Sequence, residues 1–117
     1  MKRNYIEETN IGEGDKLIAL HHFNNCCCYC GVNLTRQSGS DNSLEMDHYI
    51  SLSEQDVDEY LILDGTILNR VPACRKCNRE KSNINPEIWI RRKFNNADEI
   101  IEQIEFYFSL QKEYNFV

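Results

Sequence analysis

Two Cys-x-x-Cys pairs constrain the fold of this chain more than any other feature of its sequence. The first pair is Cys27 and Cys30, and the second is Cys74 and Cys77. Four thiolates in two tight turns satisfy Zn²⁺ tetrahedrally and leave no open coordination position, so the site that they predict is structural. Two independent redox motifs are the weaker interpretation, because neither pair lies at a strand-to-helix junction of a βαβ unit. Zinc would therefore hold both ends of the segment between the pairs.

Cys26 precedes the first pair and Cys28 lies within it, but neither has a cysteine three positions further on. We expect them to be packed or free thiols. No run approaches the roughly 20 apolar residues of a membrane helix, and the N-terminal residues lack the apolar core of a signal peptide. We therefore expect a cytoplasmic protein, in which six cysteines more often indicate metal than disulfides.

The length and composition fit one domain, residues 1–117, that can bury a core. The net charge of −6 at first argues against a nucleic-acid-binding protein. Between residues 70 and 93, however, eight cations stand against two acidic residues, which gives +6 there and leaves −12 for the rest. The cations are Arg70, Arg75, Lys76, Arg79, Lys81, Arg91, Arg92 and Lys93. We interpret the window as a phosphate-binding face, the alternative being an ordinary solvated helix face.

Two strands are expected between the cysteine pairs. Alternating side chains over residues 44–50 predict the first strand, and residues 66–71 predict a second that leads into Pro72. Neighbouring residues of a strand point to opposite faces. Asp47 and His48 can therefore serve one site only if the strand bends there, or if a metal ion lies at its end.

Helices are expected around these strands. Asp15 is the expected N-cap of a short N-terminal helix, and residues 75–81 are expected to begin a helix directly after the second cysteine pair. Asn85 is the expected N-cap of a C-terminal helical extension that covers about residues 85–116, with a proline in its first position. The core of the domain would then span about residues 26–82.

Asp47, His48 and Asn78 have the side chains that phosphodiester hydrolysis requires. A neutral histidine near pH 7 can take a proton from the attacking water. A divalent ion held by hard oxygen ligands can bind the scissile phosphate and stabilise the leaving alkoxide, and a carboxylate and an amide carbonyl offer such ligands. On the predicted helix, Asn78 and Lys81 share one face. Each residue alone has an ordinary structural explanation, but together, at this spacing from the cysteines, they favour a catalytic site.

These motifs occur in a fixed order: Cys27-x-Tyr29-Cys30-Gly31, then Glu45-Met46-Asp47-His48, then Leu68-Asn69-Arg70-Val71-Pro72-Ala73-Cys74-x-x-Cys77-Asn78-x-x-Lys81-Ser82. Over about residues 26–82, this pattern resembles the zinc-containing HNH endonucleases of the ββα-metal class. The resemblance implies a small α+β fold. Two antiparallel strands and a helix would surround the catalytic metal, a structural zinc site of four cysteines would staple them, and helices would flank this core at both termini.

The resemblance also implies a role for each matching residue. His48 would be the general base that activates water, and Asp47 and Asn78 would hold the catalytic divalent ion, Mg²⁺ or Mn²⁺. Asn69 would hydrogen-bond across the loop that carries the histidine and so orient it. Glu45 stands where some relatives have an acidic residue. The residues expected to contact nucleic-acid phosphates are Arg75, Lys76, Arg79 and Lys81.

We therefore expect a metal-dependent DNA endonuclease of the kind found in bacteriophages, mobile elements or restriction systems. One alternative is a catalytically silent zinc module that binds nucleic acid or a protein partner, and another is an HNH nuclease that acts on RNA. A single ββα site cuts one strand, so double-strand cleavage would need a homodimer, a larger assembly or two successive cleavage events.

Overall fold

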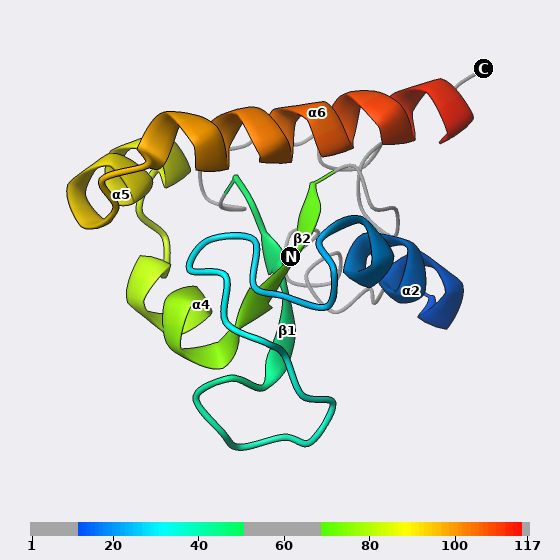
Figure 1. Cartoon of the computed structure of the whole chain (residues 1–117), viewed down its shortest axis with the longest axis horizontal. Helices are drawn as coiled ribbons and strands as arrows, with labels where there is room; N and C mark the ends of the chain where they lie inside the picture. Colours follow the sequence, from blue (N-terminus) through cyan, green and yellow to red (C-terminus); the bar gives the residue numbers. More distant parts are fainter. Residues whose placement is uncertain (1–11, 51–68, 116–117) are drawn as a thin grey trace, which may run out of the picture.

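A ββα unit lies at the centre of the molecule. The computed structural model describes residues 12–50 and 69–115 of the chain. In chain order its elements are α2 (Glu13–His22), β1 (Leu44–His48), β2 (Arg70–Cys74), α4 (Arg75–Lys81), α5 (Pro86–Lys93) and α6 (Ala97–Asn115). Helices α2, α5 and α6 flank the unit formed by β1, β2 and α4 (Figure 1). The predicted α+β class, with a ββα core and flanking helices, is confirmed.

Strands β1 and β2 pair antiparallel, with Met46 opposite Pro72 and Asp47 opposite Val71. Part of the predicted second strand, residues 66–68, lies outside the described residues; β2 begins at Arg70 and continues through Pro72. A proline is tolerated there because both strands of a two-stranded sheet are edge strands. The carbonyl of Pro72 accepts a hydrogen bond from the backbone N–H of Cys28 at 2.9 Å. The outer edge of β2 is thereby tied to the first cysteine pair.

Helix α6 closes the core. It runs across one end of the ββα unit (Figure 1) and packs against α5. Its apolar stripe consists of buried Ile100, Ile101, Ile104 and Tyr107, which join the side chains of α2 and β2 in a single hydrophobic cluster. The stripe is therefore buried within the domain.

Two of the helix starts test the expected caps. Helix α5 begins as predicted, because the Asn85 side chain accepts a hydrogen bond from the Ile88 N–H at 3.2 Å. The predicted cap at Asp15 is wrong. Helix α2 has Gly12 as its N-cap and no capping bond from a side chain, which places Asp15 inside the first turn. An acidic side chain is favourable there as well, because it faces the positive end of the helix dipole.

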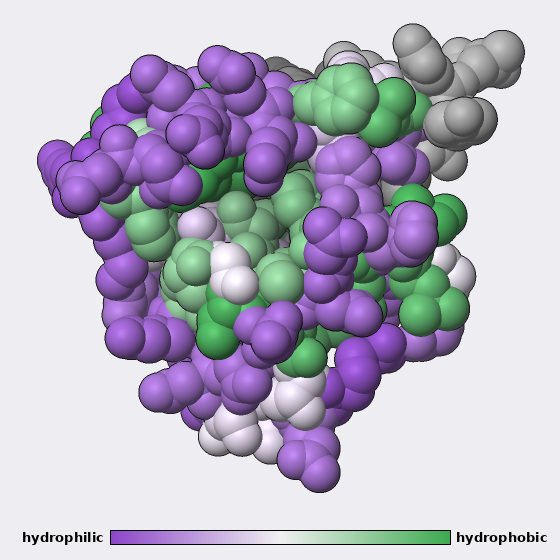
Figure 2. Space-filling model, in the orientation of Figure 1, coloured by the Kyte–Doolittle hydropathy of each residue, from purple (hydrophilic) through white to green (hydrophobic). Residues whose placement is uncertain are grey.

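The described surface has a hollow next to the first cysteine pair. On the face shown in Figure 2, hydrophobic residues gather in a depression that hydrophilic residues surround. A cavity of about 490 Å³ lies between the segment that follows α2 and the exposed side of α6, and both Cys27 and Cys30 line it. Within residues 12–50 and 69–115, none of the helices has the length and apolar character needed to cross a membrane.

Candidate active site

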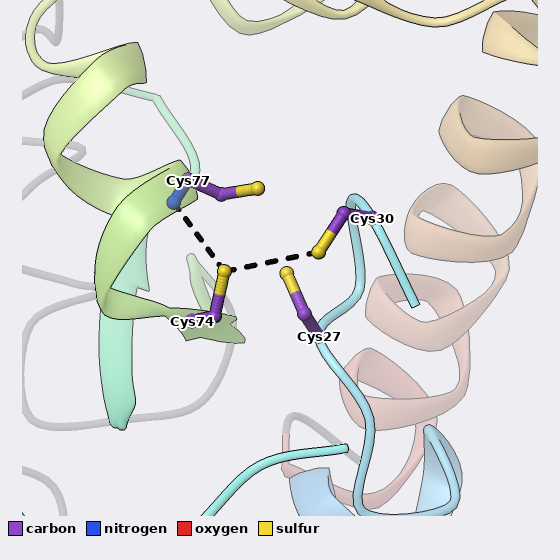
Figure 3. Close-up of side chains that lie close together, drawn as sticks. All are labelled: Cys27, Cys30, Cys74 and Cys77. Atoms are coloured by element: carbon purple, nitrogen blue, oxygen red, sulfur yellow. Dashed lines mark hydrogen bonds between the residues drawn. The ribbon is translucent and has the colours of Figure 1, made fainter. Parts of the chain in front are cut away.

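Four cysteines form a cluster beside the ββα unit. Cys27 and Cys30 approach from the loop after α2, and they face Cys74 at the end of β2 and Cys77 in α4 (Figure 3). All four Sγ atoms lie within 4.8 Å of one another, and those of Cys30 and Cys74 are 3.8 Å apart. A tetrahedral Zn²⁺ with Zn–S bonds of about 2.3 Å requires sulfurs roughly 3.8 Å apart. This four-cysteine cluster therefore fits a structural zinc ion.

Backbone geometry explains why these segments form tight turns. Gly31 has a φ of +82°, a left-handed conformation that favours glycine, and its N–H donates to the Cys27 carbonyl at 3.0 Å. The backbone N–H of Cys77 donates to the Cys74 Sγ at 3.4 Å, so this thiol also caps α4. The contact between the Cys27 and Cys77 thiols lowers the pKa of Cys27 and raises that of Cys77. Cys27 is therefore the thiol of this pair that ionises first, and a thiolate is the form that binds zinc.

The two remaining cysteines lie outside the cluster, as their spacing predicted. The Cys26 Sγ donates to the Asn24 carbonyl and to Asn33 Oδ1, both at 3.3 Å. Cys28 is buried, and burial raises the pKa of its thiol well above the usual value. Cys26 therefore makes local polar contacts, and Cys28 is a packed neutral thiol.

Helix α4 lies against β1 and brings Asn78 to the strand. The Asn78 Nδ2 donates to Glu45 Oε1 at 2.7 Å, and the Arg79 guanidinium contacts Glu45 Oε2 at 3.3 Å. Glu45 and Asp47 are two residues apart on β1, so they share one face of the strand. Lys81, on the same side of α4 as Asn78, contacts Asp47. The predicted shared face of Asn78 and Lys81 therefore packs on the strand face that carries both acids.

Asp47 is the centre of a buried polar network. Its Oδ2 accepts a hydrogen bond from the Tyr29 hydroxyl at 2.6 Å and lies 3.1 Å from the Lys81 Nζ. The same Nζ donates to the backbone carbonyl of His48 at 3.1 Å. Burial raises the pKa of Asp47, while the Lys81 ammonium and the Tyr29 hydroxyl oppose this shift. Removing one partner from such a buried pair is strongly destabilising, because it leaves an uncompensated charge.

This network corrects one prediction and modifies another. Lys81 was expected to contact nucleic-acid phosphates, but its side chain is 0% exposed and its ammonium faces Asp47 and the His48 carbonyl. The phosphate contact is wrong because the packing of α4 on β1 buries this cation. Asp47 was expected to hold the catalytic metal ion, and Tyr29 and Lys81 occupy one of its two oxygens. The sequence reasoning missed Tyr29, whose position between two zinc-site cysteines was its only signal.

His48 is the last residue of β1, and its side chain is half-buried. The hydrogen bonds expected of Asn69 are present: its side chain accepts from the Ile50 N–H at 3.0 Å and donates to the Ile50 carbonyl at 3.1 Å. The Asn69 carbonyl also accepts from the Tyr49 N–H at 2.9 Å. Asn69 thus hydrogen-bonds to both of the residues that follow His48, Tyr49 and Ile50. Both Asp47 and His48 pair in register with β2, opposite Val71 and Arg70, and β1 ends at His48.

The other cations of α4 face outward. Lys76 and Arg79 are exposed and Arg75 is half-buried. Among α5 residues, Arg91 forms an ion pair with Asp98 at 2.7 Å, and Lys93 pairs with Glu80. Arg92 of α5 is exposed as well, and Arg79 of α4 also pairs with Glu45 at 3.3 Å.

Comparison with known proteins gives one match. Residues 27–83 match the family model described as HNH endonuclease. No curated protein and no solved structure matches the chain. The matched segment contains all four clustered cysteines, together with Asp47, His48, Asn69 and Asn78.

Proposed function

Because residues 27–83 belong to the HNH endonuclease family, a family of phosphodiester hydrolases, we propose that the chain is a metal-dependent DNA endonuclease acting as a single domain. The observation that carries this proposal is the packing of α4 on β1. It sets the helix face of Asn78 against the strand face of Asp47, next to His48. The four-cysteine cluster supports the proposal by joining both halves of the unit.

The hydrogen bonds of Asp47 and Asn78 leave each residue one oxygen for a metal ion. Donors occupy Oδ2 of Asp47, and no hydrogen bond to a described residue involves Oδ1. The Asn78 amide nitrogen donates to Glu45, so its carbonyl oxygen is the atom available to a cation. Two hard oxygen donors suit Mg²⁺ or Mn²⁺. The chemistry that such an ion supplies is neutralisation of charge on the phosphoryl group and on the leaving oxygen.

His48 is the proposed general base. Its neutral imidazole takes a proton from water, the resulting hydroxide attacks phosphorus, and the bond from phosphorus to the leaving oxygen breaks. Asn69 contributes by holding Ile50 through two hydrogen bonds. We propose that this anchor fixes the chain directly after the histidine and so limits the directions that the imidazole can take.

The exposed cations of α4 are the proposed DNA-binding surface, with Lys81 excluded. In a Lys76→Gln/Arg79→Gln variant, we expect weaker DNA binding and a smaller salt dependence. Each phosphate contact contributes about 0.9 to the slope of log K against log salt, so the slope should fall by about 2. Titration of a labelled duplex at several salt concentrations measures it. Arg36→Gln is the control, since this exposed cation is not part of α4 and pairs with Glu13 of α2. An unchanged slope in the double variant would mean that the DNA binds another surface.

Cleavage of supercoiled plasmid tests the proposed function. Zinc-loaded protein should convert the plasmid to nicked circles when Mg²⁺ or Mn²⁺ is added, because one site cuts one strand. Zinc-loaded protein without an added divalent ion should leave the plasmid intact, because zinc held by four thiolates has no open coordination position. Duplex DNA, single-stranded DNA and RNA of the same sequence should be compared. Cleavage of RNA alone would assign the alternative substrate, and no cleavage of any of them by folded protein would favour the silent zinc module.

A further inference from the structure

We propose that Tyr29 and Lys81 are positioning residues that connect the four-cysteine cluster to the Asp47–His48 dipeptide. This inference rests on the proposed function. Two donors meet on a single oxygen of Asp47: the Tyr29 hydroxyl at 2.6 Å and the Lys81 ammonium at 3.1 Å. With Oδ2 held from two sides, the carboxylate cannot rotate freely, and Oδ1 has a fixed direction.

Lys81 holds two neighbouring residues at once. Its Nζ contacts the Asp47 side chain and donates to the backbone carbonyl of His48, each at 3.1 Å. An ammonium has three donors and so can serve both acceptors. Asp47 and His48 extend from opposite faces of a strand, and one cation therefore fixes the side chain of the first and the backbone of the second.

Each half of the four-cysteine cluster supplies one of these donors. Tyr29 lies between Cys27 and Cys30, and its ring packs edge-on against Trp89 with centroids 5.1 Å apart. Lys81 follows Cys77 by about one turn of α4. A metal ion that joins the two halves brings both donors to the same carboxylate. The structural zinc would thus set the position of Asp47 through Tyr29 and Lys81, in addition to stabilising the fold.

The experiment measures Mn²⁺ affinity of the zinc-loaded protein without nucleic acid, from the signal of free Mn²⁺ in electron paramagnetic resonance. Tyr29→Phe keeps the ring that packs on Trp89 and removes only the hydroxyl. We expect it to retain zinc and bind Mn²⁺ roughly 10- to 100-fold more weakly, the usual effect of losing a partner of a metal ligand. Its cleavage rate should fall and recover partly as Mn²⁺ is raised. A purely structural role would lower the melting temperature and leave Mn²⁺ affinity unchanged.

Lys81→Met should weaken Mn²⁺ binding at least as much as Tyr29→Phe, and Lys93→Met is its matched control because that lysine pairs with Glu80 at the surface. Lys81→Met leaves the buried Asp47 carboxylate without its cation, which destabilises the fold. If this variant does not fold, the Mn²⁺ affinity of Tyr29→Phe alone tests the positioning role. Wild-type Mn²⁺ affinity and cleavage in Tyr29→Phe would overturn this inference alone. A wild-type chain that neither binds Mn²⁺ nor cleaves would overturn the proposed function, and the inference with it.

Discussion

Replacement of Cys74 with serine is expected to remove zinc and unfold the domain. Cys74 is buried and belongs to three structures at once: the end of β2, the cap of α4 and the four-cysteine cluster. Zinc binding in small Cys-rich domains contributes about 10–16 kcal/mol of apparent free energy. A domain of ordinary stability has only about 5–15 kcal/mol in total. A serine hydroxyl is a poor replacement for a thiolate, so we expect this variant to lose most of its folded population.

The measurements are zinc per chain by elemental analysis and thermal unfolding by circular dichroism. Cys26→Ser is the matched control, because its hydroxyl can keep the bonds to the Asn24 carbonyl and Asn33 that the thiol makes. We expect the control to bind one zinc and melt near the wild-type temperature. Full zinc content with an unchanged melting curve in Cys74→Ser would refute a structural role for the cluster.

Local signals in the sequence predicted the parts of the fold that local chemistry determines. A tetrahedral ion takes four ligands, and two Cys-x-x-Cys turns supply them, so the spacing separated the four clustered cysteines from Cys26 and Cys28. The start of α5 was also predictable, because an asparagine cap followed by proline is a local signal for the first turn of a helix. Asp15 failed as a cap because α2 starts without a side-chain cap, with Gly12 as its N-cap three residues earlier, so no polar side chain marks this start in the sequence.

The burial of Lys81 could not be predicted from a run of cations. Lysine is rarely buried, and its neighbours Lys76 and Arg79 are exposed, as a basic surface would have them. The difference arises from packing of α4 on β1, which pairs Lys81 with Asp47 and Asn78 with Glu45. Two facts in the sequence pointed toward this arrangement: Asn78 and Lys81 share a helix face, and Glu45 and Asp47 share a strand face. What was missing was the contact between those two faces.

In the His48→Ala variant, we expect plasmid cleavage to fall by about 10²- to 10⁴-fold, the usual contribution of a general base. The substitution removes the imidazole but keeps the backbone carbonyl that accepts from Lys81 and leaves the Asn69–Ile50 hydrogen bonds intact. Zinc content and Mn²⁺ affinity should therefore stay close to those of the wild type. Single-turnover rates at saturating Mn²⁺ measure the loss.

His21→Ala is the control for this variant, because His21 is exposed near the end of α2 and takes no part in the proposed site. It should cleave at the wild-type rate. Wild-type cleavage by His48→Ala would refute the general base while leaving the metal site open to test. Loss of cleavage together with loss of Mn²⁺ binding would instead mean that the imidazole supports the metal ion. The retained backbone contact with Lys81 makes these two results separable, since it keeps Asp47 in place while only the imidazole is removed.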